Sequence, residues 1–169
     1  MATSTHRYRL AALFLLSVVI IAYELAVMRV FAVGSWSTFG SLVISIALLG
    51  NGLAGTLLTF VERRIRARGE SWLRGTSILL GPAMVLAHVL AQQIPFNPVL
   101  FATDASQLWW IGAYYLVYSI PFFVGALFTG VVFVLLSEHV HRLYFWNMAG
   151  SGIGDSWCLG SCTCSLRAI

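Results

Sequence analysis

Four polar or ionisable side chains lie inside long apolar stretches of this sequence, and their types could carry chemistry. They are Glu24, Arg29, Asn51 and His88. An ionisable group at membrane depth is costly, so its presence marks a candidate functional site. Glu24 and His88 are predicted at similar depths in two different apolar segments, where they could share a hydrogen bond. Such a pair is suited to handling protons or cations.

Each of these residues also has a structural explanation, which we favour over the functional one. A Glu24–His88 contact could simply fix the packing of two helices. Arg29 is separated from Glu24 by roughly 140° around a helix, so the two do not share a face. Arg29 is also near the outer boundary, where its guanidinium can reach the interface. Asn51 sits among the small residues of Gly50–Gly55, which favour close helix packing over ligand binding.

Motifs of soluble enzymes, cofactor sites and metal sites are missing from the sequence. The stretch Gly150–Gly154 has neither the spacing nor the strand context of a dinucleotide-binding loop. No P-loop and no serine, histidine and aspartate nucleophile motif occurs. Cys158, Cys162 and Cys164 lack the fourth ligand and the folded context that zinc requires. We therefore predict no catalytic residue, no cofactor and no metal site.

The composition predicts that lipid surrounds the chain. Of its 169 residues, 59% are hydrophobic and only 9% are charged, and the mean hydropathy is +0.87. Soluble domains are usually about 25% charged. We attribute the net charge of +4 to membrane topology and expect no nucleic-acid partner. The expected partner is the lipid bilayer, and other transmembrane helices or a homo-oligomer remain open.

Four apolar segments are each long enough to cross the hydrocarbon core as a helix. They are approximately residues 10–33, 36–61, 75–94 and 108–136. About 20 residues at 1.5 Å each cross the core of roughly 30 Å, whereas barrel strands are shorter and alternate in polarity. The predicted fold is all-α, an integral membrane bundle of about four transmembrane helices. One transmembrane domain would cover residues 1–154, with residues 148–154 as the start of a fifth helix.

Arginine placement predicts the orientation. The connections at residues 34–35 and 95–107 contain no lysine or arginine. The basic residues outside the four segments, up to residue 154, are Arg7, Arg9, Arg63, Arg64, Arg66, Arg68, Arg74 and Arg142. With four crossings, all of these fall on one side, which is the cytoplasmic side by the positive-inside rule. We therefore expect a multi-pass protein of the bacterial inner (plasma) membrane with both termini in the cytoplasm.

The last residues break the pattern. After Gly154 the apolar character stops abruptly, and residues 155–169 contain all three cysteines of the chain. We expect an irregular tail here, produced by truncation or by a frameshift.

Short motifs in the predicted segments resemble those of a known family. They are Tyr23-Glu24 with Arg29, the run Leu48–Gly55, the stretch Pro121–Gly125, and Arg142-Leu-Tyr144 followed by Gly150 and Gly154. Together they resemble the membrane region of bacterial spermidine synthase-like (polyamine aminopropyltransferase-like) proteins. Asn147 stands where that family usually has an aspartate, so the negative charge is absent at this position.

The resemblance implies a membrane region whose catalytic domain lies elsewhere. In the family, a C-terminal Rossmann-like domain binds decarboxylated S-adenosylmethionine and a diamine and transfers an aminopropyl group. That domain is missing here, so the resemblance implies no catalytic residue, and any enzyme activity is left open. It places Glu24, Arg29 and Gly52 among the membrane motifs without assigning them a role.

Three functions follow as expectations. The first is a membrane module of a spermidine synthase-like protein, truncated and not catalytic alone. The second is a small transporter or channel-like bundle for protons or polyamines, with Glu24, His88 and Asn51 along a polar path. The third is a structural or assembly subunit of the membrane. Only the first accounts for the motifs and the abrupt tail together.

Overall fold

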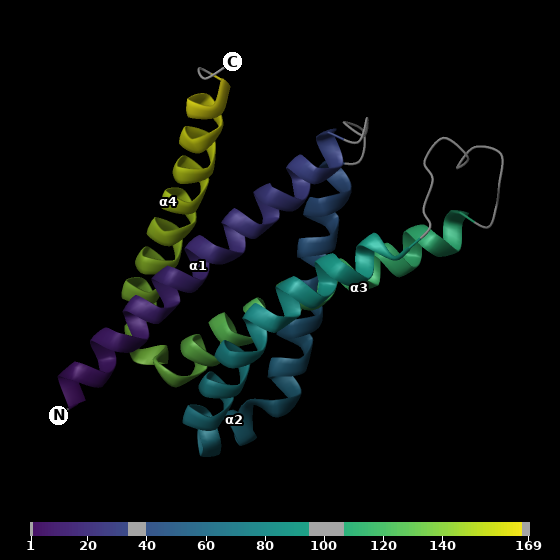
Figure 1. Ribbon diagram of the computed structural model, residues 1–169. Helices are drawn as coiled ribbons and strands as arrows, with labels where there is room; N and C mark the ends of the chain where they lie inside the picture. Colours follow the sequence, from purple (N-terminus) through teal and green to yellow (C-terminus); the bar gives the residue numbers. More distant parts are fainter. Residues whose placement is uncertain (1, 34–39, 95–106, 167–169) are drawn as a thin grey trace.

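The computed structural model describes residues 2–33, 40–94 and 107–166, and within them the side chains of residues 8–29, 42–94 and 108–157. All regular structure in these ranges is helical, which confirms the predicted all-α class (Figure 1). The elements are α1 (Ala2–Val33), α2 (Gly40–Gln92), α3 (Gln107–Leu135), the short 3-10 helix η3 (Ser137–His139) and α4 (Val140–Leu166).

Three helices contain a stretch that is long and apolar enough to cross a membrane. These stretches are Tyr8–Arg29 in α1, Leu42–Gln92 in α2 and Leu108–Leu135 in α3. The most apolar part of α1 is only 22% buried and that of α2 only 28%, whereas that of α3 is 56% buried. Apolar side chains that face outward need lipid around them. The chain is therefore a membrane protein by composition and length, with α3 as its most enclosed helix.

The long helix α2 consists of two arms joined at Arg68. The backbone of Arg68 leaves the helical region, with φ −134° and ψ 37°. We call residues 40–67 the first arm and residues 69–92 the second arm. Figure 1 shows the chain descending through the first arm, turning at the lower end and returning through the second. Residues 40–61 of the first predicted segment and residues 75–92 of the other therefore lie in one helical hairpin, whereas residues 36–39 lie outside the described residues.

Both arms pack against α3, in opposite directions. A Cβ atom added at Gly50 would lie 2.8 Å from the Cβ of Phe122, and one added at Gly130 would lie 3.3 Å from the Cγ of Leu58. The first arm thus runs parallel to α3. On the second arm, His88 contacts Tyr118, whereas Leu80 approaches α3 nearer its C-terminal end. The second arm is therefore antiparallel to α3.

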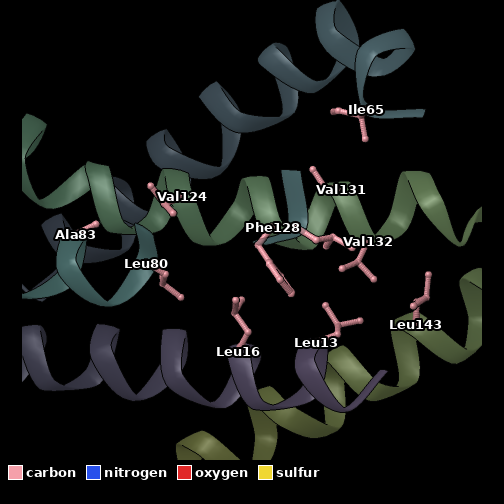
Figure 2. Close-up of a cluster of buried hydrophobic side chains, with 11 residues drawn as sticks. Leu13, Leu16, Ile65, Leu80, Ala83, Val124, Phe128, Val131, Val132 and Leu143 are labelled. Carbon is pink, nitrogen blue, oxygen red and sulfur yellow. The ribbon is translucent and has the colours of Figure 1, made fainter. Parts of the chain in front are cut away.

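Two clusters of buried side chains hold the helices together. The Leu13 cluster draws on α1, both arms of α2, α3 and α4, and Figure 2 shows Leu13 and Leu16 directed from α1 toward Phe128 and Val132 of α3. Its buried members are Leu13, Leu16, Ile65, Leu73, Leu80, Ala83, Val124, Phe128, Val131, Val132 and Leu143. The Val27 cluster comprises Val27, Val43, Ile46, Ala47, Ala91, Tyr118 and Phe122.

The membership of the clusters fixes the direction of each helix. The beginning of α1, the end of the first arm, the beginning of the second arm and the end of α3 meet in the Leu13 cluster, at Leu13, Ile65, Leu73 and Val132. The opposite parts of the same segments meet in the Val27 cluster, at Val27, Val43, Ala91 and Tyr118. Consecutive segments therefore run in alternating directions, as in an up-and-down bundle.

The last helix, α4, packs beside α1 and runs parallel to it. A Cβ atom added at Gly150 would lie 2.6 Å from the carbonyl oxygen of Phe14, and one added at Gly154 would lie 2.9 Å from that of Val18. Glycines four residues apart allow helix backbones to approach this closely. Helix α4 continues through residues 155–166, where the sequence pattern predicts an irregular tail.

The contact at Gly50 generates a stability prediction. Gly50→Ala would place its Cβ 2.9 Å from the backbone oxygen of Ser119, so α2 and α3 must separate. We expect a loss of about 1–3 kcal/mol of folding free energy, seen as a lower Tm of the detergent-purified protein. The matched control is Gly52→Ala, because an added Cβ there meets nothing within 4 Å. Equal Tm values for the two variants would show that the close approach is not limiting.

Candidate functional site

The four residues selected from the sequence do not form one site. Glu24 is half-buried on α1, and among the described residues it makes no hydrogen bond to His88. Arg29 lies in the last part of α1, which ends at Val33. Asn51 lies on the first arm of α2 and lines a separate cavity. The structure therefore contains two polar regions, one around His88 and one around Asn51.

His88 is held by side chains of its own helix and of α3. Its Nε2 lies 3.0 Å from the amide nitrogen of Gln92, and its Nδ1 lies 3.3 Å from the hydroxyl of Tyr118. An amide nitrogen donates, so Gln92 donates to Nε2, and Nδ1 shares the second hydrogen bond with the Tyr118 hydroxyl. Tyr118 is also hydrogen-bonded to Tyr114, with ring centroids 5.0 Å apart. These four side chains form one hydrogen-bonded chain.

This chain of hydrogen bonds ties the second arm of α2 to α3. Tyr118 is only 1% exposed, so its hydroxyl needs partners inside the protein. From α1, Tyr23 also reaches the second arm, where its hydroxyl donates to the carbonyl oxygen of Met84 at 3.5 Å. The ring of Tyr23 also packs on Phe122 with centroids 5.7 Å apart. The His88 region thus has the character of interhelical polar packing.

The second polar region is a cavity of about 370 Å³ where four helical segments meet. Residues of α1, the first arm of α2, α3 and α4 all contribute to its wall. The lining residues are Ser17, Ile20, Ile21, Asn51, Gly55, Leu58, Ala126, Thr129, Gly130, Asn147 and Ser151. Ser17 lies well inside the apolar stretch Tyr8–Arg29, so the cavity lies at membrane depth.

Hydroxyl and amide groups supply the polarity of this cavity. The Oγ of Ser17 lies 2.8 Å from the Oδ1 of Asn147 and 2.8 Å from the carbonyl oxygen of Leu13. Ser151 donates to the backbone oxygen of Asn147 at 3.1 Å. None of the described residues that line the cavity is ionisable. The site can therefore bind water or a small neutral polar group through hydrogen bonds, but it offers no counter-charge for an ion.

The amide of Asn51 is a polar group of the cavity that the hydrogen bonds of the described residues leave unsatisfied. More than a third of the residue is exposed, and its amide has no hydrogen-bond partner among the residues that the structure describes. At membrane depth an amide without a partner is unfavourable. A ligand, a water molecule or another polar group in the cavity would relieve that cost. This makes Asn51 the strongest candidate among the residues selected from the sequence.

The sequence pattern predicts only some of the residues that line the cavity. Ser17, Thr129 and Ser151 gave no signal, because hydroxyl residues are common in membrane helices and no spacing joins these three. The small residues of the Gly50–Gly55 run predict a packing element, and in the structure only some of them pack against another helix. Gly50 faces α3 and Ala54 is fully buried, whereas an added Cβ at Gly52 or Gly55 meets nothing within 4 Å.

Metal binding finds no support in the described side chains. No group of three or more histidine, cysteine, aspartate or glutamate residues among them could hold a metal ion. Cys158, Cys162 and Cys164 lie outside the residues whose side chains the structure describes.

The contact between Ser17 and Asn147 gives a second prediction. We expect Ser17→Ala and Asn147→Ala each to lower the free energy of unfolding, with a coupling of about 0.6 kcal/mol between them, because interhelical hydrogen bonds in membranes are modest. A double-mutant cycle measured by unfolding in mixed detergent checks this. Ser156→Ala is the control, since Ser156 bonds only within α4, to Gly152. Strictly additive effects of the two changes would contradict the contact.

The comparisons with known proteins add no relative to this description. No family model, no curated protein and no solved structure matches the chain.

Proposed function

We propose that this chain is a transmembrane helical module like the membrane region of spermidine synthase-like proteins, and that it does not catalyse aminopropyl transfer by itself. The supporting observation is where the motif residues lie. Tyr23 packs on Phe122, and Gly50 also approaches Phe122. Gly150 lies against α1 at Phe14 and Ser17. Motifs from separate segments thus meet in helix contacts, as expected if their purpose is to build a membrane module.

We propose four crossings of the bacterial inner membrane, with the N-terminus in the cytoplasm. The alternating directions of α1, the two arms of α2, and α3 support this number of crossings. We define the turn as residues 62–74, which comprise the joint at Arg68 and the adjoining ends of both arms, and it carries Arg63, Arg64, Arg66, Arg68 and Arg74. Arg9 forms an ion pair with Glu70 of this turn, so the N-terminal part of α1 lies at the same end of the bundle. Positive residues at one end are typical of a cytoplasmic face.

The direction of α4 determines on which side of the membrane the C-terminus lies. Arginine counting places both termini in the cytoplasm when the chain crosses four times. Helix α4 begins at the basic end and runs parallel to α1, so its last turns lie toward the other end of the bundle. We propose that residues 137–142 are cytoplasmic, and a reporter at the C-terminus decides whether α4 is a fifth crossing.

Topology reporters test the module. Fusions of a cytoplasm-active and a periplasm-active reporter after residues 7, 68, 100 and 140 should report cytoplasm, cytoplasm, periplasm and cytoplasm. The purified chain, supplied with decarboxylated S-adenosylmethionine and putrescine, should form no spermidine above a protein-free blank. A different reporter order would overturn the four crossings. Spermidine formation would overturn the claim that the module is not catalytic.

A second candidate function is supported by one specific observation, the polar cavity around Asn51. Transporters bind their substrates near the bilayer midplane between helices. The cavity lies between four helical segments and contains an amide without a partner among the described residues. It would suit a small solute that donates and accepts hydrogen bonds. We place this function second, because no described ionisable side chain lines the cavity.

A flux assay distinguishes this candidate from the module alone. If the cavity conducts a small neutral polar solute, proteoliposomes should take up radiolabelled glycerol, and Asn51→Leu should reduce that uptake at least tenfold. The control is Thr59→Leu on the same arm, because Thr59 is exposed and does not line the cavity. The absence of glycerol uptake by the unmodified protein would contradict this candidate function, whereas a flux of putrescine or protons would contradict the neutral character assigned to the cavity.

A further inference from the structure

A groove runs along the outer side of the second arm of α2, beginning at the turn. Its volume is about 670 Å³. The lining residues are Arg68, Ser71, Trp72, Gly75, Thr76, Ile78, Leu79, Pro82 and Leu127. Leu127 belongs to α3, and Arg68 is the joint between the arms. The other lining residues come from consecutive turns of the second arm. The groove therefore extends from the basic turn into the apolar part of the bundle, and it is separate from the cavity around Asn51.

Arg68 lies at the end of the groove nearest the turn, which we call the mouth, and no acidic side chain of the described residues neutralises its positive charge. Two glutamates lie in the turn, and each is already paired: Glu62 with Arg66 at 2.8 Å, and Glu70 with Arg9. Arg68 is exposed and has neither a hydrogen bond nor an ion pair among the described residues. A guanidinium group in this state is well suited to a phosphate, which it can bind through two parallel hydrogen bonds.

Below the mouth the groove is apolar and has an open floor. Ile78 is 75% exposed and Leu79 is 55% exposed, so both present hydrocarbon surface to the outside. Gly75 contributes no side chain, and an added Cβ there would meet nothing within 4 Å. Trp72 is half-buried close to Arg68, at the level where tryptophan favours the membrane interface. From the turn toward the bilayer centre, the groove thus presents first the charge of Arg68, then the ring of Trp72 and then the apolar side chains of residues 78 and 79.

We propose that this groove binds an anionic phospholipid of the cytoplasmic leaflet. Its phosphate would be held by the guanidinium of Arg68, with the hydroxyl of Ser71 as a further donor. One acyl chain would lie over Gly75 and along Ile78, Leu79 and Pro82. The order of charge and apolar surface matches that of a lipid with its headgroup at the interface, and the positive mouth selects a negative headgroup. The proposal requires only that the turn faces the cytoplasm.

Lipid titration of the purified full chain tests the site. We expect phosphatidylglycerol to bind in native mass spectrometry and to raise the Tm in detergent, and phosphatidylcholine to do so more weakly. Arg68→Gln should raise the half-saturating phosphatidylglycerol concentration on the order of fivefold, the effect of one arginine near an anionic surface. Gly75→Leu should fill the groove without a clash and abolish the preference.

Matched variants separate a specific site from diffuse attraction. Arg64→Gln removes an exposed charge of the same turn that does not line the groove, and Gly81→Leu adds a side chain in open space outside it. Both variants should bind phosphatidylglycerol as the unmodified protein does. Equal weakening by Arg64→Gln, unchanged binding by Gly75→Leu, or the same protection by inorganic phosphate alone would each overturn the proposal.

Discussion

The bundle depends on the close approach of α3 to its neighbours. In lipid, helices gain little from leaving the solvent, so association depends on van der Waals contact and interhelical hydrogen bonds. At Gly50 the backbones of α2 and α3 come so close that a single added carbon would lie 2.9 Å from a carbonyl oxygen. This contact brings the first arm against α3, and the return at Arg68 lays the second arm against it as well. Helix α3 thereby becomes the most enclosed helix.

Small residues at the junction of the helices leave the polar cavity open. Gly55, Ala126 and Gly130 line the junction of the helices, and none has a side chain large enough to fill it. Leu58 covers Gly130 from the first arm but leaves the space beside it open. Hydroxyl and amide groups occupy the remaining wall. The amide of Asn51 lies in this cavity, and helix packing gives it no hydrogen-bond partner among the described residues.

The sequence predicts which apolar segments form helices, but it does not predict how each helix is rotated about its own axis. Length and hydropathy predicted the apolar segments because those depend only on the chain itself. They also indicated the basic turn, which the structure places between the arms of α2. The proposed Glu24–His88 pair depended on depth alone, and matching depth leaves the angle around each helix undetermined. His88 instead contacts Tyr118, a residue that no spacing in the sequence connects to it.

The last helix was underestimated for a related reason. The end of the apolar pattern after Gly154 was interpreted as the end of order, but a helix needs only one packed face. In α4 that face contains Gly150 and Gly154, whose spacing is also that of a helix-packing motif. The sequence pattern predicts only the start of a helix, at residues 148–154. Helical structure then continues to Leu166.

The rotation of α1 gives Glu24 a different setting from the one expected. Tyr23 and Val27 pack toward α2 and α3, whereas Ser17 and Ile21 lie toward α4. Glu24 follows Ile21 by one turn and Ser17 by two turns, so it continues the face of α1 that carries α4. This geometry explains why Glu24 does not reach His88. At the second arm of α2, which carries His88, the rotation of α1 therefore places the hydroxyl of Tyr23 and not the carboxyl group of Glu24.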